Sequence, residues 1–333
     1  MEYFDYSLSL FKKIEKTDFS ELSNTSENPI RALIPFVLKN FSFEKFKELY
    51  RKETDRIIDE YLPIEKSDTE QIEKLKAIYY YDNSVNNYSW MFLFWIWNNK
   101  IEIEEADLKL LLRAEFMGMM GYRLIDLYTD DEGTNKEYFF IGNFLIRSFE
   151  QIFNDVFKTK KTFDLINYYT LKYNEIEYIE KRNLWKTCPY SWKKSFELGF
   201  KTSPLLSLFH VVFSASNSEE NKSTDLLKAL LNALAANQIL DDISDAPSDL
   251  AVGRETLVMS GFFSKYGIEN SWNDKNIKDF LNQERLVMIY KNLLELFEEA
   301  LNLAEKHEDL IFMLFIEFGK QGFLNNFEVV PIK

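Results

Sequence analysis

Residues 233–257, from which the fold can be inferred, read Ala-Leu-Ala-Ala-Asn-Gln-Ile-Leu-Asp-Asp-Ile-Ser-Asp-Ala-Pro-Ser-Asp-Leu-Ala-Val-Gly-Arg-Glu-Thr-Leu. The first half is rich in strong helix formers, and Pro247 ends the predicted helix because the residue before a proline avoids the helical region. Side chains three or four positions apart share one face of a helix. We therefore expect four side chains to converge on its last turns: Gln238, Asp241, Asp242 and Asp245.

These crowded carboxylates predict a bound cation, because like charges at such spacing repel one another. Carboxylate, water and phosphate oxygens are the usual ligands of Mg²⁺, which prefers one or two carboxylates together with substrate phosphates. The alternative is a solvated acidic helix end, since 54 of the 333 residues are Asp or Glu. The continuation of the stretch favours the metal, because Asp249, Gly253, Arg254 and Thr256 follow at short intervals.

The stretch resembles the second aspartate-rich region of trans-prenyl diphosphate synthases and related class I isoprenoid synthases. The matching patterns are Gln-x-x-Asp-Asp-x-x-Asp, which begins at Gln238, and Asp-Leu-x-x-Gly-Arg-x-Thr-Leu, which begins at Asp249. Arg254 stands where this family carries a basic residue.

A second acidic motif ends the helix predicted from Glu104 to Thr129. Asp126 and Asp130 are one turn apart and share a face. Taken alone, this spacing is more typical of a solvated turn than of a binding site. It resembles the first aspartate-rich motif of the same family, with Leu127 in place of the second aspartate.

A third motif, Lys201-Thr202, precedes Pro204 inside an apolar helical run from Trp192 to Ser214. Proline removes a backbone hydrogen bond, so we expect a kink at Thr202 or Ser203 that leaves backbone groups beside a lysine. This pattern resembles the helix break that holds the diphosphate in the family. The three motifs occur in the family's order.

The composition indicates one helix-rich globular domain over residues 1–333. Hydrophobic residues make up 46% of the chain, and it contains only 10 Gly and 7 Pro. A net charge of −14 argues against nucleic-acid binding. A single cysteine and the lack of a long apolar run predict a cytoplasmic protein without a transmembrane segment. The apolar periodicity predicts further helices over Phe43–Tyr61, Thr69–Tyr81, Tyr88–Asn98, Tyr138–Phe157, Phe163–Glu175, Thr224–Asp245, Arg254–Tyr266, Asn276–Glu305 and Glu308–Phe323.

The resemblance implies the all-α isoprenoid synthase fold, a helical bundle around a central active-site cavity. It implies that Mg²⁺ is held by Asp126, Asp130, Asp241 and Asp245, with Asp242 as a further catalytic carboxylate. It also implies that the substrate diphosphate is bound by Lys201, Thr202, Arg254 and Gln238.

The resemblance further implies a Mg²⁺-dependent enzyme that ionises an allylic prenyl diphosphate of C15–C25 length, and it allows a homodimer. We expect a terpene synthase, which cyclises or quenches the cation, because two features of chain-elongating enzymes are absent. Only Arg31 remains of their Gly-Lys-Arg signature, and Glu132–Lys136 replaces their paired arginines. Two alternatives stay open. One is a prenyltransferase that uses another acceptor, similar to the enzyme of moenomycin assembly, and the other is a catalytically reduced regulatory subunit.

Overall fold

The structure is a computed structural model that divides into two compact units, residues 1–162 and residues 163–333. The single domain expected over residues 1–333 stays a prediction. The described residues are 5, 6, 9, 13, 42–61, 69–81, 96, 101–129, 136–187, 190, 192–215, 220–267, 273–309, 312–317, 319 and 320.

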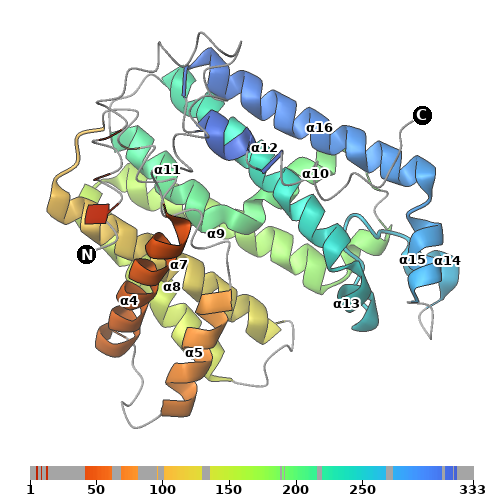
Figure 1. Ribbon diagram of the computed structural model, residues 1–333, viewed down its shortest axis with the longest axis horizontal. Coiled ribbons are helices and arrows are strands. Elements are labelled where there is room, and N and C mark those ends of the chain that lie inside the picture. The colour runs from red at the N-terminus through yellow and green to blue at the C-terminus, as the bar shows by residue number, and fades with distance from the viewer. Residues whose placement is uncertain are drawn as a thin grey trace. The chain divides into compact units, whose positions relative to one another are not determined.

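Every regular element in the described part of the chain is a helix, which confirms the predicted all-α class (Figure 1). No described helix is long and apolar enough to cross a membrane. The first unit contains α4 (Phe43–Tyr61), α5 (Thr69–Tyr81), α7 (Glu105–Thr129) and α8 (Glu137–Phe157). The second unit contains, in chain order, α9 (Lys160–Lys181, which begins just before the division), η1 (Leu184–Thr187), α10 (Trp192–Leu198), η2 (Gly199–Thr202), α11 (Ser203–Ala215), α12 (Glu220–Ser244), α13 (Ala246–Ala251), α14 (Phe262–Tyr266), α15 (Asp274–Phe280) and α16 (Gln283–Lys306).

The core of the first unit is the antiparallel pair α7 and α8, which approach closely at two glycines. A Cβ built on Gly121 would lie 2.9 Å from the carbonyl oxygen of Gly142 and 2.8 Å from the side chain of Ile146. Only glycine leaves room for backbones this close. The pairing buries Leu124 and Leu127 on α7.

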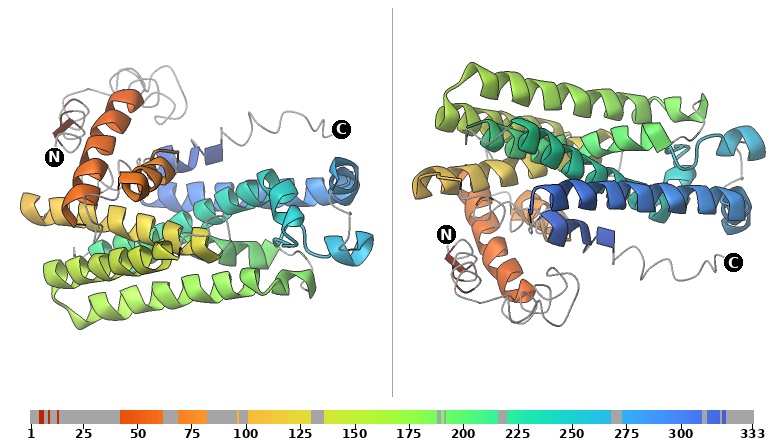
Figure 2. Two further views of the ribbon diagram at one scale, coloured as in Figure 1. Left: turned by 90° about the horizontal axis from the view of Figure 1, so that it is seen from below. Right: turned by 90° about the horizontal axis from the view of Figure 1, so that it is seen from above.

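The second unit is built around α12, which runs antiparallel to α16 (Figure 2). Asp225, near the start of α12, accepts from Lys306 and His307 at the end of α16, with both distances 2.7 Å. The middle of α12 is buried on almost its whole circumference from Ala229 to Ala236. Such a helix forms the centre of a core. Its acidic end is thereby held in one place relative to the rest of the unit.

The break predicted at Pro204 is confirmed and carries Lys201. Helix α10 ends at Leu198, one 3₁₀ turn follows over Gly199–Thr202, and α11 begins at Ser203. Gly199 lies against α12, because a Cβ there would stand 2.6 Å from both Cδ1 and the carbonyl oxygen of Leu231. The 3₁₀ turn that bears Lys201 is therefore packed directly on the backbone of the central helix.

Pro247 ends α12 as expected, and it occupies the first turn of the next helix, α13. Three predicted helices are wrong in their extent. The helix predicted over Phe163–Glu175 is longer at both ends, as α9. The chain is not helical over all of Arg254–Tyr266, because Gly253 and Gly261 adopt φ of 80° and 87° and turn it, so that helix begins only at Phe262. The helix expected over Asn276–Glu305 is two helices, since Asn282 interrupts it and caps α16 by accepting from Arg285 N.

The helices predicted over Tyr88–Asn98 and Glu308–Phe323 lie partly outside the described residues. The aromatic helix predicted over Tyr88–Asn98 lies outside the described residues except for Ile96, which is helical. Of the helix predicted over Glu308–Phe323, Phe312–Glu317 is helical.

Gly199→Ala tests the packing of the 3₁₀ turn on α12. The added methyl group would overlap a backbone oxygen that cannot move alone, so we expect a loss of about 1–3 kcal/mol in the free energy of unfolding. Urea denaturation measures this loss, with Asn174→Ala on the exposed face of α9 as the control. A stability equal to that of the control would show that this close approach does not constrain the turn.

Candidate functional site

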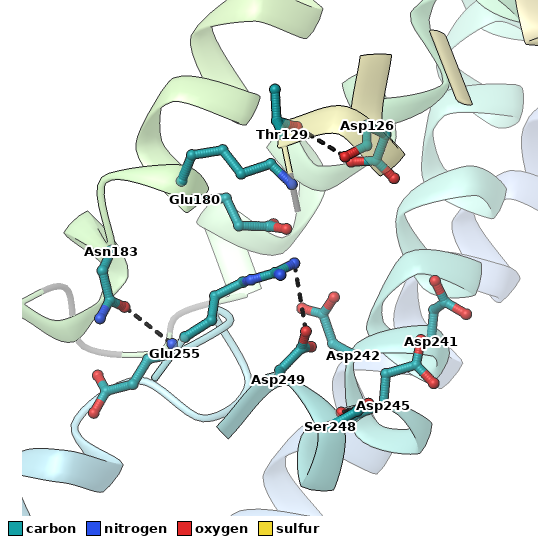
Figure 3. A network of polar contacts seen from close by, with 12 residues as sticks. Asp126, Thr129, Glu180, Asn183, Asp241, Asp242, Asp245, Ser248, Asp249 and Glu255 are labelled. Carbon is teal, nitrogen blue, oxygen red and sulfur yellow. Dashed lines mark hydrogen bonds and ion pairs between the residues drawn. The ribbon is translucent and has the colours of Figure 1, made fainter. Parts of the chain in front are cut away.

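The aspartates at the end of α12 divide between two faces of the helix. Asp242 is buried, whereas Asp241 and Asp245 are exposed. Gln238 Nε2 donates to Asp242 Oδ1 at 3.2 Å and lies 3.5 Å from Asp241 Oδ2. Consecutive helical residues point about 100° apart, so the single face expected for all four side chains is wrong. Figure 3 shows Asp241 and Asp245 projecting from one side of the helix end and Asp242 from another.

Asp242 is a buried acid. The residue is 3% exposed, and its Oδ2 has no hydrogen-bond partner among the described residues. Burial raises the pKa of this carboxyl well above its usual range, Glu180 raises it further, and Lys201 opposes the shift. A cation brought next to Asp242 would lower the pKa of its carboxyl and favour the ionised form.

Lys201 is held by a buried carboxylate that the sequence analysis did not identify. Its Nζ lies 2.9 and 3.0 Å from the two carboxylate oxygens of Glu180. The lysine side chain is 17% exposed and the glutamate side chain 4%. The neighbouring Thr202 hydroxyl donates to Gly199 O at 2.8 Å and closes the 3₁₀ turn. Thr202 is thus engaged in local structure, and a phosphate contact from its hydroxyl would require this bond to open.

Arg254 lies just after α13 and pairs with Asp249. The distance from Arg254 Nη1 to Asp249 Oδ1 is 3.5 Å, and both side chains are largely buried. Burial raises the pKa of Asp249 to about 6, although Arg254 acts in the opposite direction. Both Asp242 and Asp249 are influenced by Glu180 and Lys201, so these charges form one polar cluster in the second unit.

The first aspartate motif belongs to the first unit. Asp126 Oδ2 accepts from Arg123 Nη1 at 2.9 Å, and Asp130 lies outside the described residues. Leu127 is buried with the core of α7, so an aspartate there would lose most of its hydration. The Mg²⁺ site expected from Asp126, Asp130, Asp241 and Asp245 stays a prediction.

Comparison with solved structures finds 14 chains that match this architecture, including the following two. The polyprenyl synthase from Caulobacter crescentus CB15, solved in complex with calcium and isoprenyl diphosphate, matches with a TM-score of 0.61 at 12% identity, over 83% of this chain and 96% of its own. The geranylgeranyl pyrophosphate synthetase from the archaeon Geoglobus acetivorans matches with a TM-score of 0.58 at 14% identity, over 84% of this chain and 97% of its own. This chain has the isoprenoid synthase fold. No protein-family model and no curated protein matches the sequence.

The burial of Glu180 could have been predicted from its spacing to the apolar residues of α9. Buried residues of α9 recur three or four positions apart at Tyr169, Tyr173 and Ile176, and Glu180 is the next in this series. A carboxylate on the apolar face of a helix needs a partner inside the protein. The sequence alone does not indicate which cation meets it, because Lys201 is 21 residues away.

The residues at the end of α12 fit a divalent cation that is shared with a phosphate ligand. Among the residues that the structure describes, no group of three or more His, Cys, Asp or Glu side chains is placed to hold a metal ion. Mg²⁺ sites that include substrate phosphates need only one or two carboxylates. Asp241 and Asp245, one turn apart on an exposed face, supply such carboxylates.

The raised pKa of Asp249 predicts a stability that depends on pH. A carboxyl whose pKa is 3.8 unfolded and about 6 folded stabilises the protein fully only below pH 3.8, and this contribution is lost as the pH rises through 6. Relative to Asp249→Asn, the wild type should therefore lose unfolding free energy between about pH 4 and pH 7. Denaturation of both proteins across this range measures the difference, with Asp279→Asn on the surface of α15 as the control. A difference in unfolding free energy between the wild type and Asp249→Asn that stays constant with pH would contradict the raised pKa of Asp249.

Proposed function

We propose that this protein binds an allylic prenyl diphosphate at the polar cluster of the second unit and ionises it with the help of a divalent cation. The observation that carries the proposal is the pairing of two largely buried cations, Lys201 and Arg254, with carboxylates beside the acidic end of α12. Buried cations next to metal-binding carboxylates suit a ligand that is itself polyanionic and metal-bound. The isoprenoid synthase fold supports the same substrate class, since one solved neighbour is a polyprenyl synthase bound to isoprenyl diphosphate and the other is named a geranylgeranyl pyrophosphate synthetase.

The residues of the cluster divide the work on the diphosphate. Lys201 and Arg254 would donate to phosphate oxygens and so stabilise the negative charge that grows as the carbon–oxygen bond breaks. Asp241 and Asp245 would hold Mg²⁺. When bound, the ion neutralises charge on the leaving diphosphate. Gln238, which donates to both Asp241 and Asp242, would keep these carboxylates oriented.

No protein nucleophile is required for this reaction, because the bond breaks by departure of the diphosphate. An allylic cation remains and must be shielded from water until it is cyclised or quenched. We propose a terpene synthase, because the chain lacks the Gly-Lys-Arg signature and the arginine pair of chain-elongating enzymes. Chain elongation is the second candidate, and the names of the two solved neighbours favour it. The homodimer and the cytoplasmic location stay predictions.

The substrate is tested by incubating the pure protein and Mg²⁺ with C10, C15, C20 and C25 allylic diphosphates, each with and without isopentenyl diphosphate. We expect pyrophosphate and a hydrocarbon or alcohol from a C15–C25 substrate alone. Longer diphosphates that form only with isopentenyl diphosphate would instead identify an elongating enzyme. Absence of turnover would leave transfer to another acceptor or a regulatory subunit as the role of the protein.

Lys201→Ala and Arg254→Ala should each lower the rate of pyrophosphate release about 10²-fold, the usual cost of removing one group that stabilises developing charge. The matched control is Lys228→Ala, since Lys228 forms an exposed ion pair with Glu299 away from the cluster. Asp241→Ala and Asp245→Ala should abolish turnover. Turnover that survives both lysine and arginine replacements would remove the polar cluster from the mechanism.

A further inference from the structure

Asn183 holds the backbone on both sides of Arg254. Its Nδ2 donates to Gly253 O at 3.0 Å, and its Oδ1 accepts from Glu255 N at 3.0 Å (Figure 3). One amide side chain therefore satisfies the carbonyl group before the arginine and the N–H group after it. The contact joins segments 70 residues apart in the sequence.

The backbone N–H and the side chain of Arg254 are held by Asp249 of α13. Arg254 N donates to Asp249 O at 2.9 Å, while the Asp249 carboxylate lies against the guanidinium group. The following residue is also fixed, because the buried Glu255 carboxylate accepts from Gly261 N at 3.0 Å and from Phe263 N at 2.5 Å. The backbone around Arg254 is thus held by hydrogen bonds on both sides, although Arg254 lies outside any helix.

The conformation of Asn183 suits this position. Its φ is 53°, in the left-handed region that asparagine tolerates better than most residues, and it follows the last turn of α9. Three residues earlier, Glu180 accepts from Lys201. The end of α9 therefore contacts Lys201 through Glu180 and both neighbours of Arg254 through Asn183.

We propose that Asn183 is a positioning residue that places the Arg254 guanidinium for the diphosphate. This inference rests on the proposed function. Asn183 acts only through Arg254 and has no contact with the ligand itself. Without the amide, the chain on either side of Arg254 loses two hydrogen bonds, and the guanidinium samples positions that no longer match the phosphate oxygens.

The test uses Asn183→Gly, because glycine keeps the left-handed backbone accessible while removing the amide. The probe is inorganic pyrophosphate, titrated calorimetrically in the presence of Mg²⁺. We expect its affinity to fall about tenfold, the equivalent of one to two hydrogen bonds. Glu308→Gly is the matched control, since Glu308 also has a φ of 53° and is exposed after α16. This control should bind pyrophosphate as the wild type does.

A double-mutant cycle separates positioning from a general structural role. If Asn183 acts through Arg254, adding Asn183→Gly to Arg254→Ala should change the affinity by less than about twofold. In a Lys201→Ala background, the loss of about tenfold should remain. Equal losses in both backgrounds would overturn the inference, because Asn183 would then support the whole site and not Arg254.

Thermal unfolding of each variant shows whether it is folded. If Asn183→Gly does not fold, Asn183→Asp replaces it in the same cycle, because this variant keeps the acceptor for Glu255 N and loses only the donor to Gly253 O. Wild-type affinity in a folded Asn183 variant would overturn the inference while leaving the proposed function intact. A wild type that binds no pyrophosphate would overturn the proposed function and the inference together.

Discussion

A lysine that is mostly withdrawn from water needs a counter-charge, and the contact between Lys201 and Glu180 supplies it. Leaving such a charge buried without a partner costs about 3–5 kcal/mol. The described polar cluster nevertheless has three carboxyl groups, Glu180, Asp242 and Asp249, for the two cations Lys201 and Arg254. Burial raises the pKa of both aspartates, which is how the cluster tolerates the excess acid. A bound metal ion would add positive charge to the cluster, and a bound diphosphate would add negative charge.

The same elements that bury the cluster also fix its geometry. Helix α12 brings the aspartates, and the 3₁₀ turn packed on α12 at Gly199 brings Lys201. The end of α9 contacts Lys201 and the backbone next to Arg254. None of these positions depends on a long unsupported side chain. Rigid placement of donors before the substrate arrives is the property that makes electrostatic stabilisation effective.

Local signals allowed much of the fold to be predicted from the sequence. The apolar periodicity gave α4 and α5 their bounds, Pro247 ended α12, and Pro204 marked the break beside Lys201. The non-helical chain over residues 254–261 was missed because Gly253 and Gly261 adopt positive φ and because Gly253 O is held by Asn183, 70 residues away in the sequence. In the site, Lys201 and Arg254 followed from a resemblance. Glu180 meets Lys201 across 21 residues, and Asn183 meets Gly253, the neighbour of Arg254, across 70 residues; no local pattern encodes such pairs.

A crystal structure of the protein with Mg²⁺ and inorganic pyrophosphate tests the central claim, that the cluster around Lys201 and Arg254 holds the diphosphate. The account predicts phosphate oxygens within hydrogen-bond distance, about 2.7–3.2 Å, of Lys201 Nζ and the Arg254 guanidinium, with metal ions on Asp241 and Asp245. Pyrophosphate bound elsewhere, with the Glu180–Lys201 and Asp249–Arg254 contacts unchanged, would contradict it.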